Sequence, residues 1–264
     1  ANRSLIELAK KYFELDTANK MVVFKSNLTL EESKEVSSLK PMPKDFLPAA
    51  GSILLTTFYK MSGIAVENIS SPVYDYIILE EASQCFLGTI AAAKLLGKKV
   101  ILVGDSIQLP PVVNQDNPDN ISPNIDLMLE SFTYYASTIN CPKFRLTTTY
   151  RFSENACYQT NTFYENSLKS KSNVQKGNEI FSRIPNIYNN KGGCSLFYYD
   201  STNLKNIYDL LLGQIKTLLQ INPKFEIAIL SSTKKGVKLL RDNLLHKLND
   251  KQDQILINTV DSVQ

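Results

Sequence analysis

Two short apolar segments, residues 76–79 and 100–103, each run directly into polar side chains. Paired glutamates follow the first segment, and Gly-Asp-x-x-Gln follows the second. Short apolar runs of this kind are typical of strands buried in a parallel sheet, and residues 86–96 between them predict the crossover helix. Because α/β proteins bind ligands where such strands end, the sequence predicts a binding site beside these polar residues.

The alternation of apolar segments and amphipathic helices extends along the chain. Because strands that alternate with helices of this length pair in parallel, we predict an α/β fold. The alternation begins again near residue 144, which predicts two domains, residues 1–143 and 144–264. The other predicted strands are residues 21–24, 52–57, 144–149, 195–199, 225–230 and 255–260. The other predicted helices are residues 4–15, 125–136, 204–219 and 234–248. Residues 112–124, rich in Asn, Asp and Pro, predict a surface loop.

Composition narrows the class of protein. The net charge is +3, from 29 basic and 26 acidic residues, so a nucleic-acid surface on this chain must be a local groove. The four cysteines are far apart and form no C-x-x-C pair, which argues against a zinc site or a disulfide framework. The single histidine, His246, lies in a segment with helical periodicity, where a structural role is expected. No segment is apolar enough to span a membrane, so we expect an intracellular chain, cytoplasmic or in the nucleus or nucleoid, with no membrane partner.

The paired glutamates, Glu80 and Glu81, allow two interpretations. Adjacent glutamates after a strand often form the solvated start of a helix. Here four apolar residues precede the pair and a glutamine follows three residues later, which favours carboxylates delivered to a nucleotide-bound metal ion. Mg²⁺ prefers oxygen ligands in near-ideal octahedral geometry, so a site for Mg²⁺ and a nucleotide is the interpretation we adopt.

Residues 76–84, Y-I-I-L-E-E-A-S-Q, and residues 104–111, G-D-S-I-Q-L-P-P, are similar to motifs II and III of superfamily 1 helicases. The second motif resembles the branch that contains the nonsense-decay and Okazaki-fragment-processing helicases, which are P-loop NTPases of the AAA type. The resemblance implies two RecA-like domains, both incomplete within this chain, that use ATP and Mg²⁺. It also implies 5′→3′ movement along single-stranded DNA or RNA.

The resemblance implies a role for each polar residue after the two strands. Glu80 stands where the family has Asp, one methylene shorter, and would hold the water shell of Mg²⁺. Glu81 would polarise the attacking water. Gln108 would sense the γ-phosphate, a role that suits an amide because it both donates and accepts hydrogen bonds. Asp105 would orient Gln108 or the water shell of Mg²⁺.

Residues 146–151, L-T-T-T-Y-R, resemble motif IV of the same family. The resemblance implies that Arg151 is an arginine finger, which reaches the γ-phosphate from the second domain. An arginine in that role accelerates phosphoryl transfer by roughly 10³–10⁵. Tyr150 would pack beside the nucleotide base or anchor the end of the strand.

Residues 258–264, N-T-V-D-S-V-Q, resemble the beginning of motif V. In that motif the hydroxyls, here those of Thr259 and Ser262, would contact the nucleic-acid backbone. A strand that runs into an Asp-Ser turn is the alternative interpretation.

Two shorter segments resemble motifs that hold backbone phosphates. Ser26-Asn27 follows a predicted strand as motif Ia does, and Thr56-Thr57 ends another as motif Ib does. Contacts of this kind position a strand without reading its sequence. Both segments are short enough to arise by chance, so a simple strand end is the alternative for each.

The sequence contains no G-x-x-x-x-G-K-[ST], the loop that cradles phosphates. We expect that loop to precede Ala1 and motif VI to follow Gln264, which would make the chain the central part of a longer helicase. We therefore expect negligible ATPase activity from residues 1–264 alone. The alternative function is a non-catalytic RecA-like module that binds nucleic acid or protein, which Glu80 in place of Asp also favours.

Overall fold

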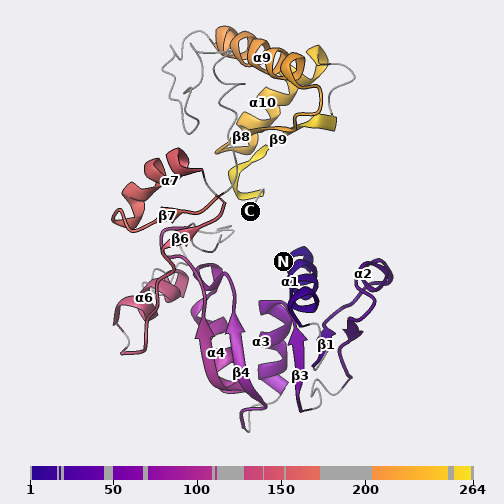
Figure 1. Cartoon of the computed structure of the whole chain (residues 1–264), viewed down its shortest axis with the longest axis vertical. Helices are drawn as coiled ribbons and strands as arrows, with labels where there is room; N and C mark the ends of the chain where they lie inside the picture. Colours follow the sequence, from indigo (N-terminus) through magenta and orange to yellow (C-terminus); the bar gives the residue numbers. More distant parts are fainter. Residues whose placement is uncertain are drawn as a thin grey trace, which may run out of the picture. The chain divides into compact units, whose positions relative to one another are not determined.

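The chain divides into two compact units, Ala1–Arg145 and Leu146–Gln264. Each unit combines helices with small parallel sheets in this computed structural model, which confirms the predicted α/β class (Figure 1). The identification of the units with two RecA-like domains that meet at residues 143 and 144 stays a prediction. The structure describes residues 2–16, 18, 21–44, 50–67, 71–108, 111, 128–138, 140–151, 153–172, 204–248 and 253–262.

The first sheet of the first unit has the strand order β2-β1-β3, with both neighbours parallel to β1. Its elements are α1 (Asn2–Leu15), β1 (Val22–Lys25), α2 (Leu30–Glu35), β2 (Lys40–Pro41) and β3 (Ser52–Leu55). Buried apolar side chains from α1, β1 and β3, and from the turn after α2, form one core. They are Ile6, Ala9, Val23, Val36, Leu39 and Leu55.

The second sheet of this unit pairs β4 with β5, again in parallel. Its strands and the helices around them are α3 (Phe58–Glu67), β4 (Tyr74–Leu79), α4 (Leu87–Leu96), β5 (Gly97–Leu102) and α6 (Ser131–Thr138). The core lies between the helices α3 and α4 and one face of the sheet, and includes Met61, Ile64, Leu79, Ile90 and Leu96. A short 3-10 turn, η1 (Ala82–Gln84), joins β4 to α4.

The second unit contains two further parallel pairs. In the first pair the elements are β6 (Thr148–Thr149), α7 (Glu154–Thr160), η3 (Asn161–Tyr164) and β7 (Lys169–Ser170). In the second they are α9 (Leu204–Ile221), β8 (Ile227–Ser231), α10 (Lys234–Leu244), η4 (Leu245–Lys247), β9 (Ile255–Thr259) and η6 (Val260–Ser262). The helices α9 and α10 pack on β8 and β9 around Ile215, Leu219, Leu244 and Ile257.

The structure corrects one predicted strand and contains helices that were not predicted. The strand predicted at residues 144–149 is only Thr148–Thr149, and Phe144 and Leu146 are 94% and 86% exposed. The helices α3 and α7 were not predicted. The predicted strand at 195–199, the loop at 112–124 and residues 109–110 of the motif III segment lie outside the described residues.

No helix within the described ranges is long and apolar enough to cross a membrane.

Candidate functional site

The carboxyl ends of β4 and β5 lie side by side. Leu79 pairs with Leu102 at the end of the ladder, and two further backbone hydrogen bonds extend it. Val103 N donates to Leu79 O over 2.9 Å, and Ala82 N donates to Val103 O over 2.8 Å. The two segments that the sequence placed at strand ends, 80–81 and 104–105, are therefore neighbours at one edge of the sheet.

Glu81 occupies the left-handed region of the backbone, with φ 56°. This region is unfavourable for a side chain longer than that of Asn or Asp, by about 1–2 kcal/mol. Its side chain is exposed and makes no capping hydrogen bond to η1. The strained residue thus presents an exposed carboxylate at this edge of the sheet, and such strain is often found at functional sites.

Glu80 has a raised pKa. Partial burial raises the pKa of Glu80, and the charge of neighbouring Glu81 raises it further. Both causes disfavour a second negative charge in this position. A cation bound beside the pair would oppose both effects and favour the ionised carboxylate.

Gly104 allows the two strand ends to approach closely. A Cβ at this position would lie 2.8 Å from Ser83 N and 3.2 Å from Ala82 N, both backbone atoms of η1. The Ser83 hydroxyl is buried and has no hydrogen-bond partner among the described residues. No role was predicted from the sequence for Gly104 or Ser83, although a glycine directly after a strand is a visible signal of close backbone approach.

Asp105 and Gln108 are joined in the turn after β5. Gln108 Nε2 donates to Asp105 Oδ2 over 3.2 Å, and Ile107 N donates to Asp105 Oδ1 over 3.1 Å. Gln108 itself is exposed. The carboxylate therefore orients the glutamine, which is one of the two roles expected for Asp105.

The residues at this edge suit Mg²⁺ bound together with a nucleotide. The side chains present oxygen donors, which are the ligands that Mg²⁺ prefers. In the part of the chain that the structure describes, no three acidic, histidine or cysteine side chains form a cage that could hold a metal by themselves. Glu80 and Glu81 supply two carboxylates, and Mg²⁺ usually takes one or two carboxylates and completes its shell with water and phosphate oxygens.

A second group of predicted residues lies at the ends of β1 and β3. Lys25 pairs with Leu55, and Ser26 N donates to Leu55 O over 3.0 Å, so the segments 26–27 and 56–57 are adjacent. Ser26 is only 1% exposed, whereas Asn27 is exposed and left-handed, with φ 52°.

The two threonines after β3 differ in their surroundings. Within the described residues, Thr56 Oγ1 is buried without a hydrogen-bond partner. Thr57 Oγ1 accepts a hydrogen bond from Lys60 N over 3.4 Å, at the start of α3. Thr57 therefore has a structural role whether or not it binds a ligand.

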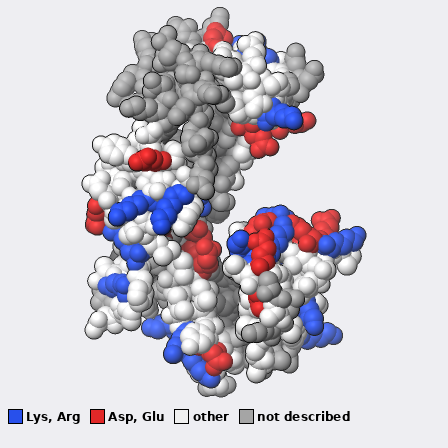
Figure 2. Space-filling model, viewed as in Figure 1, with Lys and Arg blue, Asp and Glu red and all other residues white. Residues whose placement is uncertain are grey.

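In the second unit, Tyr150 and Arg151 follow β6 and are exposed, Tyr150 to 68%. Arg151 N donates to Thr149 Oγ1 over 3.3 Å. The neighbouring strand β7 carries exposed Lys169 and is followed by exposed Lys171, and Figure 2 shows the resulting basic group near α7. Arg151 thus belongs to a locally positive surface.

The remaining predicted pair, Thr259 and Ser262, lies at the end of β9. Thr259 Oγ1 donates to Ser262 Oγ over 3.1 Å, and Ser262 Oγ donates to Thr259 O over 2.7 Å. Thr259 pairs with Ser231 of β8. The polar turn after β8, which ends at the cap Thr233, was given no role from the sequence, whereas the start of α10 at Lys234 was predicted correctly.

Comparison with known protein families gives a match in the first unit. Residues 20–116 match a family model described as an AAA domain, which points to the helicase-like P-loop NTPases. The matched segment contains β1 to β5 and the strand ends of the first unit described above. No curated protein matches the chain. The predicted resemblance to helicases is therefore confirmed at the level of this domain.

Proposed function

We propose that the chain is the central part of an ATP-dependent superfamily 1 helicase that couples ATP hydrolysis to movement along single-stranded DNA or RNA. The observation that carries the proposal is the parallel pairing of β4 with β5. It brings the acids at positions 80–81 beside the Gly104-Asp105 turn, within the segment that matches an AAA domain.

In this proposal the residues at the edge of β4 and β5 divide the chemistry between them. Glu81 accepts a hydrogen bond from the attacking water and polarises it, and Glu80 holds water molecules of the Mg²⁺ shell. When bound, Mg²⁺ would neutralise charge on the nucleotide phosphates. Gln108, held by Asp105, would contact the γ-phosphate, and Arg151 would act as the arginine finger that the resemblance implies.

The nucleic-acid strand would lie over the ends of the other parallel pairs. In the first unit, Ser26, Asn27, Thr56 and Thr57 would contact its phosphates through backbone N–H groups, hydroxyls and the Asn27 amide. Such contacts hold a strand independently of its sequence. In the second unit, the turn that contains Thr259 and Ser262 would do the same.

Binding to single-stranded nucleic acid can be tested on the chain itself by fluorescence anisotropy with labelled oligo-dT and oligo-U. The variant Asn27→Asp keeps a side chain that tolerates the left-handed backbone but adds a negative charge. A charge about 4 Å from a phosphate in water opposes binding by about 1 kcal/mol, so we expect affinity to fall about fivefold. The matched control is Asn166→Asp, which is also exposed and left-handed, with φ 57°. Equal affinities for both variants and the unsubstituted chain would contradict the proposal.

Hydrolysis is tested in the full reading frame, where we expect the phosphate-binding loop. Glu81→Gln should abolish ATP hydrolysis and leave ATP binding largely intact, because it preserves shape but removes the group that polarises water. Glu80→Gln should instead weaken Mg²⁺-dependent nucleotide binding. Turnover retained by Glu81→Gln would contradict the assignment.

One observation favours a second candidate function, a non-catalytic RecA-like module. Glu80 occupies a position where the resembling helicases have Asp, so the carboxylate reaches farther into a site that demands strict geometry. Nucleic-acid binding without nucleotide hydrolysis by the full reading frame would favour this module over the motor.

A further inference from the structure

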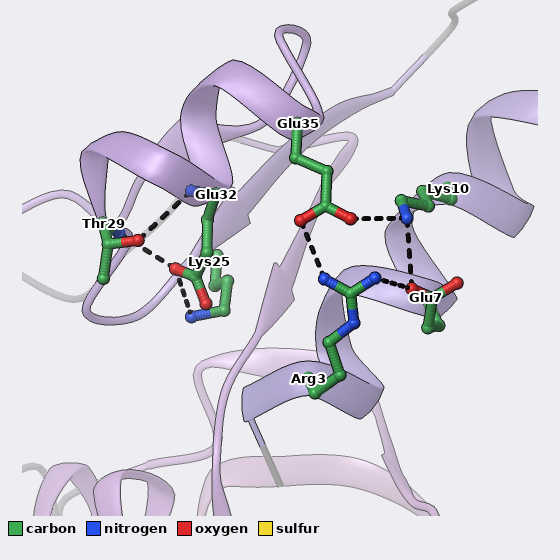
Figure 3. Close-up of polar contacts among 7 residues, drawn as sticks. All are labelled: Arg3, Glu7, Lys10, Lys25, Thr29, Glu32 and Glu35. Carbon is green, nitrogen blue, oxygen red and sulfur yellow. Dashed lines mark hydrogen bonds and ion pairs between the residues drawn. The ribbon is translucent and has the colours of Figure 1, made fainter. Parts of the chain in front are cut away.

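Lys25, the last residue of β1, is fully buried, although lysine is rarely so. Among the described residues its ammonium group has two partners, Ser26 and Glu32, and Figure 3 shows the contact with Glu32. Lys25 Nζ lies 3.1 Å from Glu32 Oε2 of α2 and donates to Ser26 O over 3.3 Å. The charge is therefore directed at the turn that carries the candidate phosphate contacts.

Glu32 contacts the residues on both sides of this turn, Lys25 and Thr29. The oxygen that pairs with Lys25, Oε2, also accepts a hydrogen bond from Thr29 N over 2.9 Å. In return Glu32 N donates to Thr29 Oγ1 over 3.2 Å, which completes a capping box at the start of α2. One carboxylate thus holds the residue before the turn and the residue after it.

These contacts determine which way the peptide between Ser26 and Asn27 faces. The carbonyl of Ser26 points towards the buried ammonium of Lys25. In a trans peptide the following N–H points in the opposite direction, and no cis peptide occurs among the described residues. The N–H of Asn27 is therefore directed away from Lys25, beside an exposed side chain.

We propose that Lys25 and Glu32 are positioning residues, which hold the Ser26–Asn27 turn so that the N–H and side-chain amide of Asn27 face a nucleic-acid phosphate. The inference rests on the proposed function, since it names the residues that shape one of the proposed contacts. Neither Lys25 nor Glu32 contacts the nucleic acid in this arrangement.

The ionised state of Glu32 is maintained by its surroundings. The hydrogen bond from Thr29 N lowers the pKa of Glu32 most, and Lys25 lowers it further, against the opposing effect of burial. The carboxylate is therefore charged at neutral pH and can compensate the buried ammonium. Without it, Lys25 would be a buried and unpaired charge, which is strongly unfavourable.

The same helix provides a matched control. Glu35, one turn after Glu32, pairs with Lys10 Nζ over 2.6 Å and with Arg3 over 2.8 Å, both on α1 (Figure 3). Figure 2 shows acidic and basic side chains intermixed over α1 and α2. These ion pairs direct the Glu35 carboxylate to α1 rather than to the turn, so Glu35→Gln removes a carboxylate from α2 and leaves the turn in place.

The experiment measures the affinity of the 264-residue chain for labelled oligo-dT and oligo-U of about twenty nucleotides, over a range of salt concentrations. Lys25→Met and the double variant Lys25→Met/Glu32→Gln should each bind about tenfold more weakly, as expected for one misplaced hydrogen bond to a charged group. The double variant leaves no unpaired buried charge, and glutamine still suits the capping box, so it guards against loss of the fold. Glu35→Gln should bind within twofold of the unsubstituted chain. Far-UV circular dichroism checks that each variant is folded.

The salt dependence separates positioning from direct contact. A lysine that binds a phosphate contributes about 0.7 to the slope of log affinity against log salt for single strands. Because Lys25 is buried, we expect its variants to keep the slope of the unsubstituted chain. A reduced slope would overturn the positioning role in favour of direct contact.

Two further outcomes distinguish this inference from the proposed function. In the first outcome, the unsubstituted chain binds and Asn27→Asp weakens binding, but the folded Lys25 variants bind as tightly as the unsubstituted chain. That result would overturn the inference and leave the proposed function in place. If the unsubstituted chain binds neither oligonucleotide, both are overturned.

Discussion

Replacing Glu81 with glycine should raise the free energy of unfolding of the first unit. The left-handed backbone at φ 56° costs a glutamate about 1–2 kcal/mol, and glycine adopts it freely. Glycine also gains conformational freedom in the unfolded chain, which offsets about 0.5–1 kcal/mol of this relief. The net change expected for Glu81→Gly is therefore a stabilisation of about 0.5–1 kcal/mol.

Glu80→Gly is the matched comparison, because Glu80 is not among the residues with positive φ. Each substitution removes one of the two adjacent carboxylates, so the loss of their mutual repulsion is the same in both. Beyond that shared change, Glu80→Gly has the unfavourable effect of glycine on the unfolded chain, and it relieves no left-handed strain. We therefore expect Glu81→Gly to be the more stable variant by about 1–2 kcal/mol, the full left-handed penalty.

Urea unfolding followed by far-UV circular dichroism measures this difference, since the chain has no tryptophan to report by fluorescence. Equal stabilities of the two glycine variants would show that Glu81 is not strained, and would remove the argument that strain marks a functional residue here.

Three further predictions concern single residues. Gly104→Ala should destabilise the chain by about 1–3 kcal/mol in the same assay, because its Cβ would meet a backbone nitrogen at 2.8 Å. Gly88→Ala, in helix α4 with nothing within 4 Å, should instead stabilise it by up to about 1 kcal/mol, and the reverse order would contradict the packing argument. Burial raises the pKa of Cys85 to about 12, so iodoacetamide at pH 8 should modify exposed Cys141 and spare Cys85 until the chain unfolds, as mass spectrometry of the peptides would reveal. In the full reading frame, Arg151→Ala should reduce kcat and kcat/KM for ATP together, with little change in nucleotide affinity. A loss confined to affinity would refute its role as an arginine finger.

The strands of both units could largely be predicted from the sequence, because apolar runs of four to six residues between polar turns have few other interpretations. The parallel pairing of β4 with β5 also follows from the helix between them. Their register does not follow, since a shift of two residues would keep the same faces buried. The direct adjacency of Leu79 and Leu102 therefore required the structure.

The strand predicted at residues 144–149 shows where periodicity misleads. Its apolar residues alternate as in a half-buried strand, but Phe144 and Leu146 are exposed and only two residues pair with β7. Alternation describes a face that could be buried, and burial depends on a partner surface that is distant in sequence. By contrast, α3 was overlooked although Met61, Ile64 and Ala65 have helical spacing and are buried.

The positioning role of Lys25 and Glu32 could not be predicted from the sequence, for a different reason. Thr29 and Glu32 form a recognisable capping-box pattern, so the start of α2 could have been predicted. The burial of Lys25 could not, because a lysine at a strand end is normally solvated and only its pairing with Glu32 makes burial possible. Tertiary contacts, rather than local pattern, decide the environment of a charged residue.

Asn27 and Glu81 occupy the same structural position in two different sheets. Each is the second residue after its strand, each is left-handed with φ 52° and 56°, and each is exposed. Asparagine adopts this conformation readily, and its use after β1 needs no functional explanation. The same turn after β4 could be made with asparagine at lower conformational energy, so the backbone does not require a glutamate there. What glutamate adds at that position is a carboxylate beside Glu80 and the Asp105 turn, and this is the group that the proposed chemistry requires.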